Sequence, residues 1–190
     1  AGNDCGTVAI MQGGDVTIAD INALSFEQTT AASTSVSAAG VLTLSGGVTS
    51  SGTTSLTSTA DDTGAGITFS QNTKTILSAG ALTITADDMT LDGIITATTV
   101  TLKSNTAADA IDLGSAGTTT GGTLELSNAE LQTITASQLD IGTGAAGAIA
   151  VSADVTPGSG AGGAGVAVHL LSGSTVPGTA GGIVAGPLIP

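Results

Sequence analysis

The chain has 190 residues, of which 15 are Asp or Glu and only two, Lys74 and Lys103, are basic, so its formal net charge is −13 at pH 7. Such an acidic surface repels the phosphates of nucleic acids and of anionic membranes. Aromatic residues make up 1% of the chain, too few to build the shelves on which bases and sugar rings stack. Every apolar run is shorter than the roughly 18 residues of a membrane-spanning helix. We therefore expect no nucleic-acid partner and no membrane span.

Short triplets with the pattern apolar–polar–apolar recur along the chain, each bounded by Gly, Ser, Asn or Asp. They lie at residues 16–18, 42–44, 67–69, 82–84, 89–91, 100–102, 111–113, 124–126, 139–141, 149–151 and 166–168. A period of two residues predicts β-strands. No segment repeats its apolar residues with the period of a helix, and Thr and Gly are poor helix formers, so we expect almost no helix.

Strands of three residues are too short for an ordinary β-sandwich, in which strands run to about five or six residues. They suit a β-solenoid, in which each coil lays its strand on the previous one at a spacing of roughly 4.8 Å. The apolar residues then face inward, the polar residue faces solvent, and small residues turn the corners. The predicted fold is all-β, a parallel β-helix (β-solenoid) with short strands and Gly-rich corners.

An internal repeat supports this fold. Residues 55–62 match residues 81–88 at an offset of 26, with six of eight positions identical. Other spacings between strand centres vary, which indicates several strands per coil and irregular corners rather than one strict repeat.

The composition changes near the C-terminus. We expect a β-solenoid domain over residues 1–156, a Gly-rich insertion or linker over residues 157–165, and a terminal strand with an apolar tail over residues 166–190. An apolar tail without charge is unusual on a soluble monomer, so we expect it to pack on a neighbouring copy of the chain. The predicted assembly residues are Ile183, Val184, Leu188 and Ile189.

Two pairs of carboxylates form the candidate metal site. Asp61 and Asp62 end one copy of the internal repeat, and Asp87 and Asp88 end the other. Each pair suits a solvated turn. If the offset of 26 residues equals one coil, however, the pairs stack, and like charges about 5 Å apart favour a hard cation such as Ca²⁺ between them. We expect no other cofactor.

The remaining reactive side chains predict no catalysis. His169 is the single histidine and lies in an apolar strand beside Leu170, which indicates a structural role. Cys5 is the single cysteine, so it forms no disulfide within the chain, and we expect an incidental thiol.

Residues 80–89 and 124–142 resemble the repeats of filamentous-haemagglutinin-like adhesins, which are very large bacterial surface proteins. Residues 148–153 and 170–176 extend the likeness, which covers roughly residues 40–182. The resemblance implies a right-handed parallel β-helix, secretion to the cell surface, and an adhesive or fibrous role without catalysis.

We therefore expect a non-enzymatic, extracellular structural protein whose copies assemble into a fibre or surface layer. The terminal coils of a solenoid expose unpaired N–H and C=O groups, which the next subunit can cover. One alternative is an adhesin module that binds a host or glycan ligand. A polysaccharide-cleaving β-helix enzyme is a third possibility, which the scarcity of basic residues disfavours. Thr-x-Thr pairs at residues 57–59 and 83–85 also suit ice binding.

Overall fold

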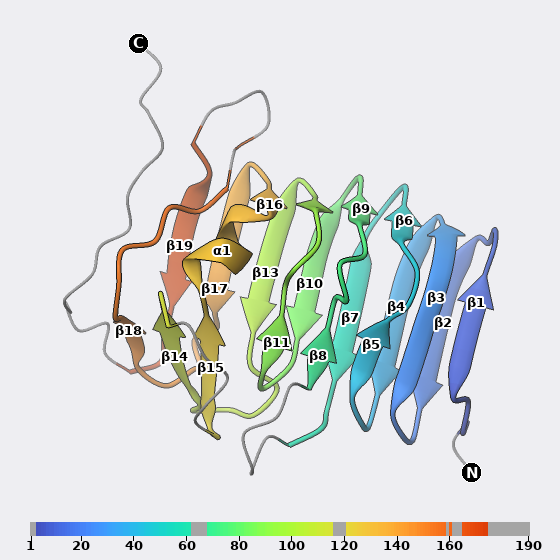
Figure 1. The fold of residues 1–190 in the computed structure, drawn as a ribbon, viewed down its shortest axis with the longest axis horizontal. Helices are drawn as coiled ribbons and strands as arrows, with labels where there is room; N and C mark the ends of the chain where they lie inside the picture. The colour runs from blue at the N-terminus through green and yellow to red at the C-terminus, as the bar shows by residue number, and fades with distance from the viewer. Residues whose placement is uncertain (1–2, 62–67, 116–120, 159, 161–164, 175–190) are drawn as a thin grey trace.

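The computed structural model describes residues 3–61, 68–115, 121–158, 160 and 165–174. Within these ranges the chain consists almost entirely of β-strands that pair in parallel and stack one coil upon the next. Figure 1 shows the stack side-on, with the first coils at the right and the last at the left. The predicted β-solenoid is confirmed.

Sheet A contains seven strands, and every pairing in it is parallel. Its spatial order follows the sequence: β2 (Asp15–Asp20), β4 (Ser33–Ala38), β7 (Thr54–Ser58), β10 (Ala81–Thr85), β13 (Thr99–Lys103), β17 (Gln138–Gly142) and β19 (Ala167–Leu171). The last strand, which follows the Gly-rich segment, therefore adds to the same sheet as the first.

Sheet B begins with β1 (Thr7–Ile10) and the eight-residue β3 (Leu24–Ala31), and then divides into two rows. One row contains β5 (Leu42–Leu44), β8 (Phe69–Ser70) and β11 (Met89–Thr90), and the other contains β6 (Val48–Ser50), β9 (Ile76–Ser78), β12 (Ile95–Thr96) and β16 (Ile134–Thr135).

The division of sheet B follows from one inserted residue. Phe26 pairs with Leu44, and Thr29 pairs with Val48, so the later coil has one residue more between its paired positions. The extra residue makes a corner where β3 runs straight on. Gly46 lies at this corner, where a Cβ atom would overlap the backbone of Gln28.

Sheet C is the smallest and departs from sequence order, because β14 (Ala110–Leu113) lies between β15 (Thr123–Leu126) and β18 (Ile149–Val151). The described residues contain one helix, α1 (Asn128–Gln132), which follows β15. Ser127 and Glu130 form a capping box at its start.

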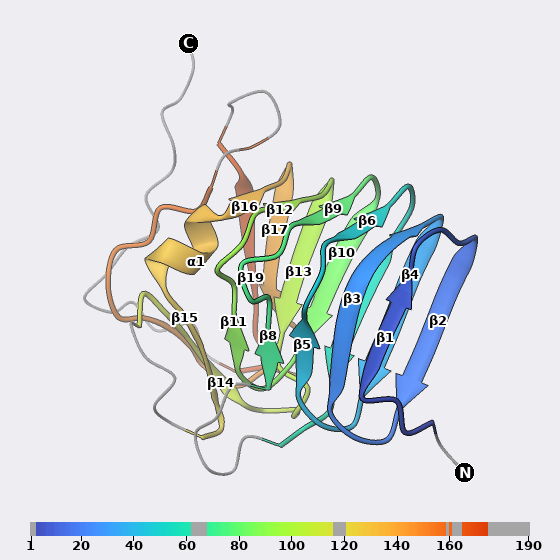
Figure 2. The same ribbon diagram turned by 45° about the vertical axis from the view of Figure 1, so that its right-hand side comes forward.

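The chain passes from sheet B to sheet A in each coil. In Figures 1 and 2 the sheet B strands run upward in front, the sheet A strands run downward behind, and the stack advances from right to left. This is the right-handed sense that a parallel β-helix was expected to have.

The core is built of rows in which equivalent residues stack on one another. One inward row of sheet A consists of Ile18, Val36, Leu56, Ile84, Leu102, Ile141 and Leu170. The Thr or Ser between inward positions faces outward, as the triplet pattern predicted. All the predicted triplets lie in or overlap these strands, although residue 67 lies outside the described residues.

The coil offset predicted from the internal repeat was wrong by two residues. Leu56 pairs with Ile84, at an offset of 28, and not with Leu82. Leu82 and Ile84 both face inward and are both fully buried, so a shift of two residues keeps every side chain on its correct face.

Candidate functional site

The two edges of sheet A are the candidate site. At one edge β2 pairs with β4, and at the other β19 pairs with β17. Among the described residues, the outer edge of β2 has one partner, Asn3, which forms a single bridge to Asp20. The remaining backbone groups along these edges are the kind that another parallel strand can pair with.

Burial along the inward row shows that both ends are incomplete. Leu56, Ile84, Leu102 and Ile141 have no exposed surface, whereas Ile18 and Leu170, at the two ends of the row, are partly buried. Ile21, which follows β2, is 52% exposed, and Leu171 of β19 is 43% exposed. Apolar surface is therefore concentrated where the sheet stops.

Polar contacts fix the first edge strand. The Asp20 carboxylate is buried and accepts hydrogen bonds from the backbone N–H groups of Cys5 (2.7 Å) and Asn22 (2.8 Å). These bonds hold the segment around Asn3 against the end of β2. At the start of the strand, Ser33 donates its hydroxyl to Asp15 (2.7 Å).

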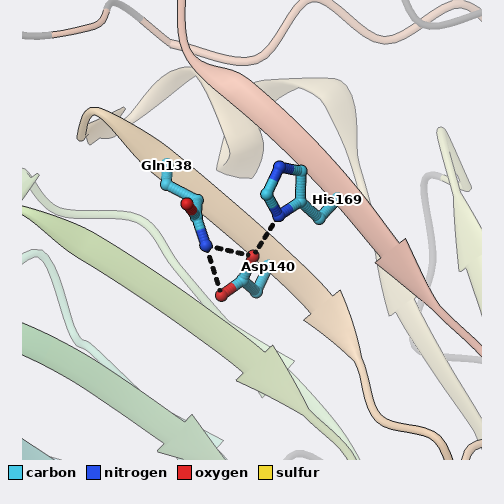
Figure 3. Close-up of polar contacts among 3 residues, drawn as sticks. All are labelled: Gln138, Asp140 and His169. Atoms are coloured by element: carbon cyan, nitrogen blue, oxygen red, sulfur yellow. Dashed lines mark hydrogen bonds and ion pairs between the residues drawn. The ribbon is translucent and has the colours of Figure 1, made fainter.

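A second polar cluster fixes the last strand. The Nδ1 atom of His169 lies 3.1 Å from Oδ1 of Asp140, which pairs with it across β17 and β19 (Figure 3). The Gln138 side-chain amide donates to both oxygens of the same carboxylate, at 2.9 and 3.0 Å. The His169 side chain is 52% exposed, so the cluster lies on the outer surface of the sheet.

The middle of the outer surface of sheet A carries hydroxyl groups. One outward row consists of Thr17, Ser35, Ser55, Thr83 and Thr101, and continues into Asp140 and His169. Thr57 pairs with Thr85 in the neighbouring row. The hydroxyls are thus aligned in rows, with Ser as well as Thr, and ice binding stays a prediction.

A shallow groove of about 610 Å³ follows the corner between sheets A and B. Thr30, Thr49, Leu77 and Thr96 pair in successive coils and line one side of this corner groove, and small residues line the turn beside them. No charged side chain contributes to its lining.

The candidate calcium residues have other roles where the structure describes them. Asp87 is buried and accepts the N–H and the hydroxyl of Thr106, each at 2.6 Å. Asp88 is buried as well, Asp61 is exposed, and Asp62 lies outside the described residues. The stacking argument assumed an offset of 26 residues, whereas β7 and β10 pair at 28. In the described part of the chain no three His, Cys, Asp or Glu side chains gather as a metal site would need, and calcium binding stays a prediction.

Two further predictions concern the ends of the chain. Ile183, Val184, Leu188 and Ile189 lie outside the described residues, so their role in assembly stays a prediction. Cys5 is a free, partly buried thiol that packs against the core beside the first coil.

The sequence did not predict the contact between Asp140 and His169, because 29 residues separate them and coil lengths vary. It did contain the signal for α1: Ser127 precedes Glu130 by three positions, which is the spacing of a capping box.

We compared the chain with protein-family models, with curated proteins and with solved structures, and none of the three comparisons found a match. Among the described residues, no helix has the length and apolarity needed to cross a membrane. The function must therefore be argued from the geometry of the solenoid.

Proposed function

We propose that this chain is a non-enzymatic, extracellular structural protein, a β-solenoid subunit that stacks end to end with copies of itself into a fibre. The observation that carries the proposal is the burial along the inward row of sheet A. Its five middle positions are buried, whereas Ile18 and Leu170 at the two ends keep apolar surface exposed to solvent. A further coil at either end would bury that surface.

The two edges are complementary because all strands of sheet A run in the same direction. A second copy that places its β2 beside β19 continues the sheet with the parallel pairing already used inside the chain. Such contacts join two different surfaces, so they leave a free edge at each end and propagate as an open fibre. Apolar burial at each junction contributes about 25 cal/mol per Å².

The geometry around His169 supports the absence of nucleophilic catalysis. In a catalytic triad the imidazole lies between the carboxylate and the hydroxyl. Here Asp140 lies between His169 and Thr101 in the outward row, so Thr101 is separated from the imidazole by the carboxylate. An extracellular location is supported by the resemblance of residues 80–89 and 124–142 to secreted adhesin repeats.

Electron microscopy and sedimentation velocity of the purified chain test this proposal. We expect unbranched fibres one solenoid wide, whose mass rises with protein concentration. Ile18→Asp should abolish them by placing a charge at the junction, whereas the matched outward change Thr83→Asp, in the middle of the same sheet, should not. A chain that stays monomeric at high concentration while retaining its β-sheet circular dichroism contradicts the proposal.

The corner groove favours a second candidate function, an adhesin module that binds a neutral glycan. Its uncharged lining, with Thr30, Thr49 and Thr96 repeating from coil to coil, suits a linear polymer of sugars lying along the solenoid axis. Binding of a panel of neutral polysaccharides, lost in the variant Thr49→Lys and kept in Thr83→Lys, would favour this function. Identical binding by both variants would exclude the groove.

A further inference from the structure

The two edge strands of sheet A match each other in length. β19 has five residues, Ala167–Leu171. β2 has six residues, but its last residue, Asp20, is already bridged by Asn3 on its outer edge. The part of β2 that is open to a new strand is therefore Asp15 to Ala19, which has the same length as β19.

We propose that a second copy of the chain docks its β2 on β19 in one register, with Thr17 of the second copy beside His169. This inference rests on the proposed function and specifies its interface. In this register Asp15 lies beside Ala167 and Ala19 lies beside Leu171, so all five open positions are paired.

The inward side chains favour this register. Val16 of the second copy stacks on Val168, and Ile18 stacks on Leu170, so both inward rows continue across the junction with apolar partners. Val168 and Leu170 are only partly buried in the single chain, as is Ile18. Their remaining surface is covered when the next coil is added.

Neighbouring registers are disfavoured by identifiable contacts. Because side chains alternate between faces, only shifts of two residues keep the apolar side chains inside. One such shift sets Asp20 beside Leu170, where the Asn3 segment already occupies the edge. The opposite shift sets Asp15 beside His169, which brings opposite charges together when the imidazole is protonated, but it leaves Val168 beside Gly14 and Ile18 beside Ser172.

Disulfide cross-linking distinguishes the registers. Paired residues on adjacent strands lie roughly 4.8 Å apart, within the Cα separation of a disulfide, whereas diagonal neighbours at about 7–8 Å are too far apart. Within one chain the two edges are six strand spacings apart, or roughly 29 Å, so a disulfide between them must join two copies.

The experiment uses the full chain with Cys5→Ser as background. The pair Thr17→Cys and His169→Cys should give a ladder of covalent multimers on a non-reducing gel after mild oxidation. A second pair, Ala19→Cys and Leu171→Cys, tests the same register and leaves the contact between Asp140 and His169 intact. The matched control, Ser35→Cys with His169→Cys, places one thiol on an interior strand and should give no ladder.

The remaining outcomes decide between the inference and the proposed function. Fibres that cross-link through Asp15→Cys with His169→Cys, and not through the two expected pairs, would overturn the register and keep end-to-end assembly. If all variants keep β-sheet circular dichroism, yet sediment as monomers and form no ladder, the register and the proposed function both fail.

Discussion

The Glu130 carboxylate connects α1 to a strand 39 residues earlier in the chain, because its Oε1 atom accepts the backbone N–H of Leu91 at 3.1 Å. Its Oε2 atom accepts both the backbone N–H and the hydroxyl of Ser127, each at 2.8 Å. One side chain therefore caps the helix and fixes the helix against β11, which ends beside Leu91.

Replacing Glu130 with Ala should destabilise the protein by about 1–3 kcal/mol, since three donors lose a charged acceptor. For a chain of this length that corresponds to a fall in melting temperature of about 2–4 °C per kcal/mol. Glu27→Ala is the matched control, because Glu27 is exposed on β3 and its carboxylate forms none of the hydrogen bonds found. Equal melting temperatures for the two variants would contradict the role of Glu130.

The corner at Gly46 should tolerate no side chain. A Cβ atom there would overlap the backbone of Gln28, which is held in the neighbouring coil, so we expect Gly46→Ala to cost about 1–3 kcal/mol. Gly14→Ala provides the control, because a Cβ atom at Gly14 meets no atom within 4 Å. Chemical denaturation of both variants measures the difference, and a Gly46→Ala variant as stable as Gly14→Ala would show that the coils can separate at this corner.

The short triplets of the sequence predicted the fold because stacking makes an alternating pattern sufficient. Wherever two apolar residues flank a Thr or an acidic residue, as in Leu82, Thr83 and Ile84, the apolar side chains enter the core and the middle one faces out. The eight-residue β3 was not predicted, since Glu27 and Gln28 are both exposed and interrupt the alternation.

Register and proximity could not be predicted from the same pattern. Paired positions in adjacent strands of sheet A are separated by as few as 18 residues, as for Thr17 and Ser35, and by as many as 39, as for Thr101 and Asp140. Segments of different length between coils leave the inward and outward faces unchanged. The sequence therefore indicates which residues face inward but not which residues of distant coils meet.

Calcium binding at the two Asp pairs has a direct test. If Ca²⁺ joins Asp61 and Asp62 to Asp87 and Asp88, the melting temperature should rise with Ca²⁺ and fall after chelation, because an ion that binds the folded state stabilises it. Asp61→Asn should remove the response. Asp92→Asn is the control, because Asp92 is exposed outside these pairs and accepts the N–H of Thr73. Melting temperatures unaffected by chelation would contradict the calcium site.

The inward row of sheet A should separate stability from assembly. Leu56→Ala, in the middle of the row, creates a cavity among fully buried neighbours and should lower the free energy of unfolding by about 2–5 kcal/mol. Leu170→Ala, at the end of the row, removes a side chain that is only partly buried in the single chain, so its effect on unfolding of the monomer should be smaller.

Assembly should respond in the opposite order. A fully buried Leu side chain contributes about 1.5–3 kcal/mol, and each 1.4 kcal/mol changes an equilibrium constant tenfold. Because Leu170 gains its remaining burial at the junction, Leu170→Ala should raise the concentration at which fibres form by up to roughly tenfold to a hundredfold. Leu56→Ala should leave that concentration nearly unchanged under conditions where the variant stays folded. Sedimentation over a concentration series measures both, and equal thresholds for Leu170→Ala and the unmodified chain would show that the edge of β19 is not the surface that joins the copies.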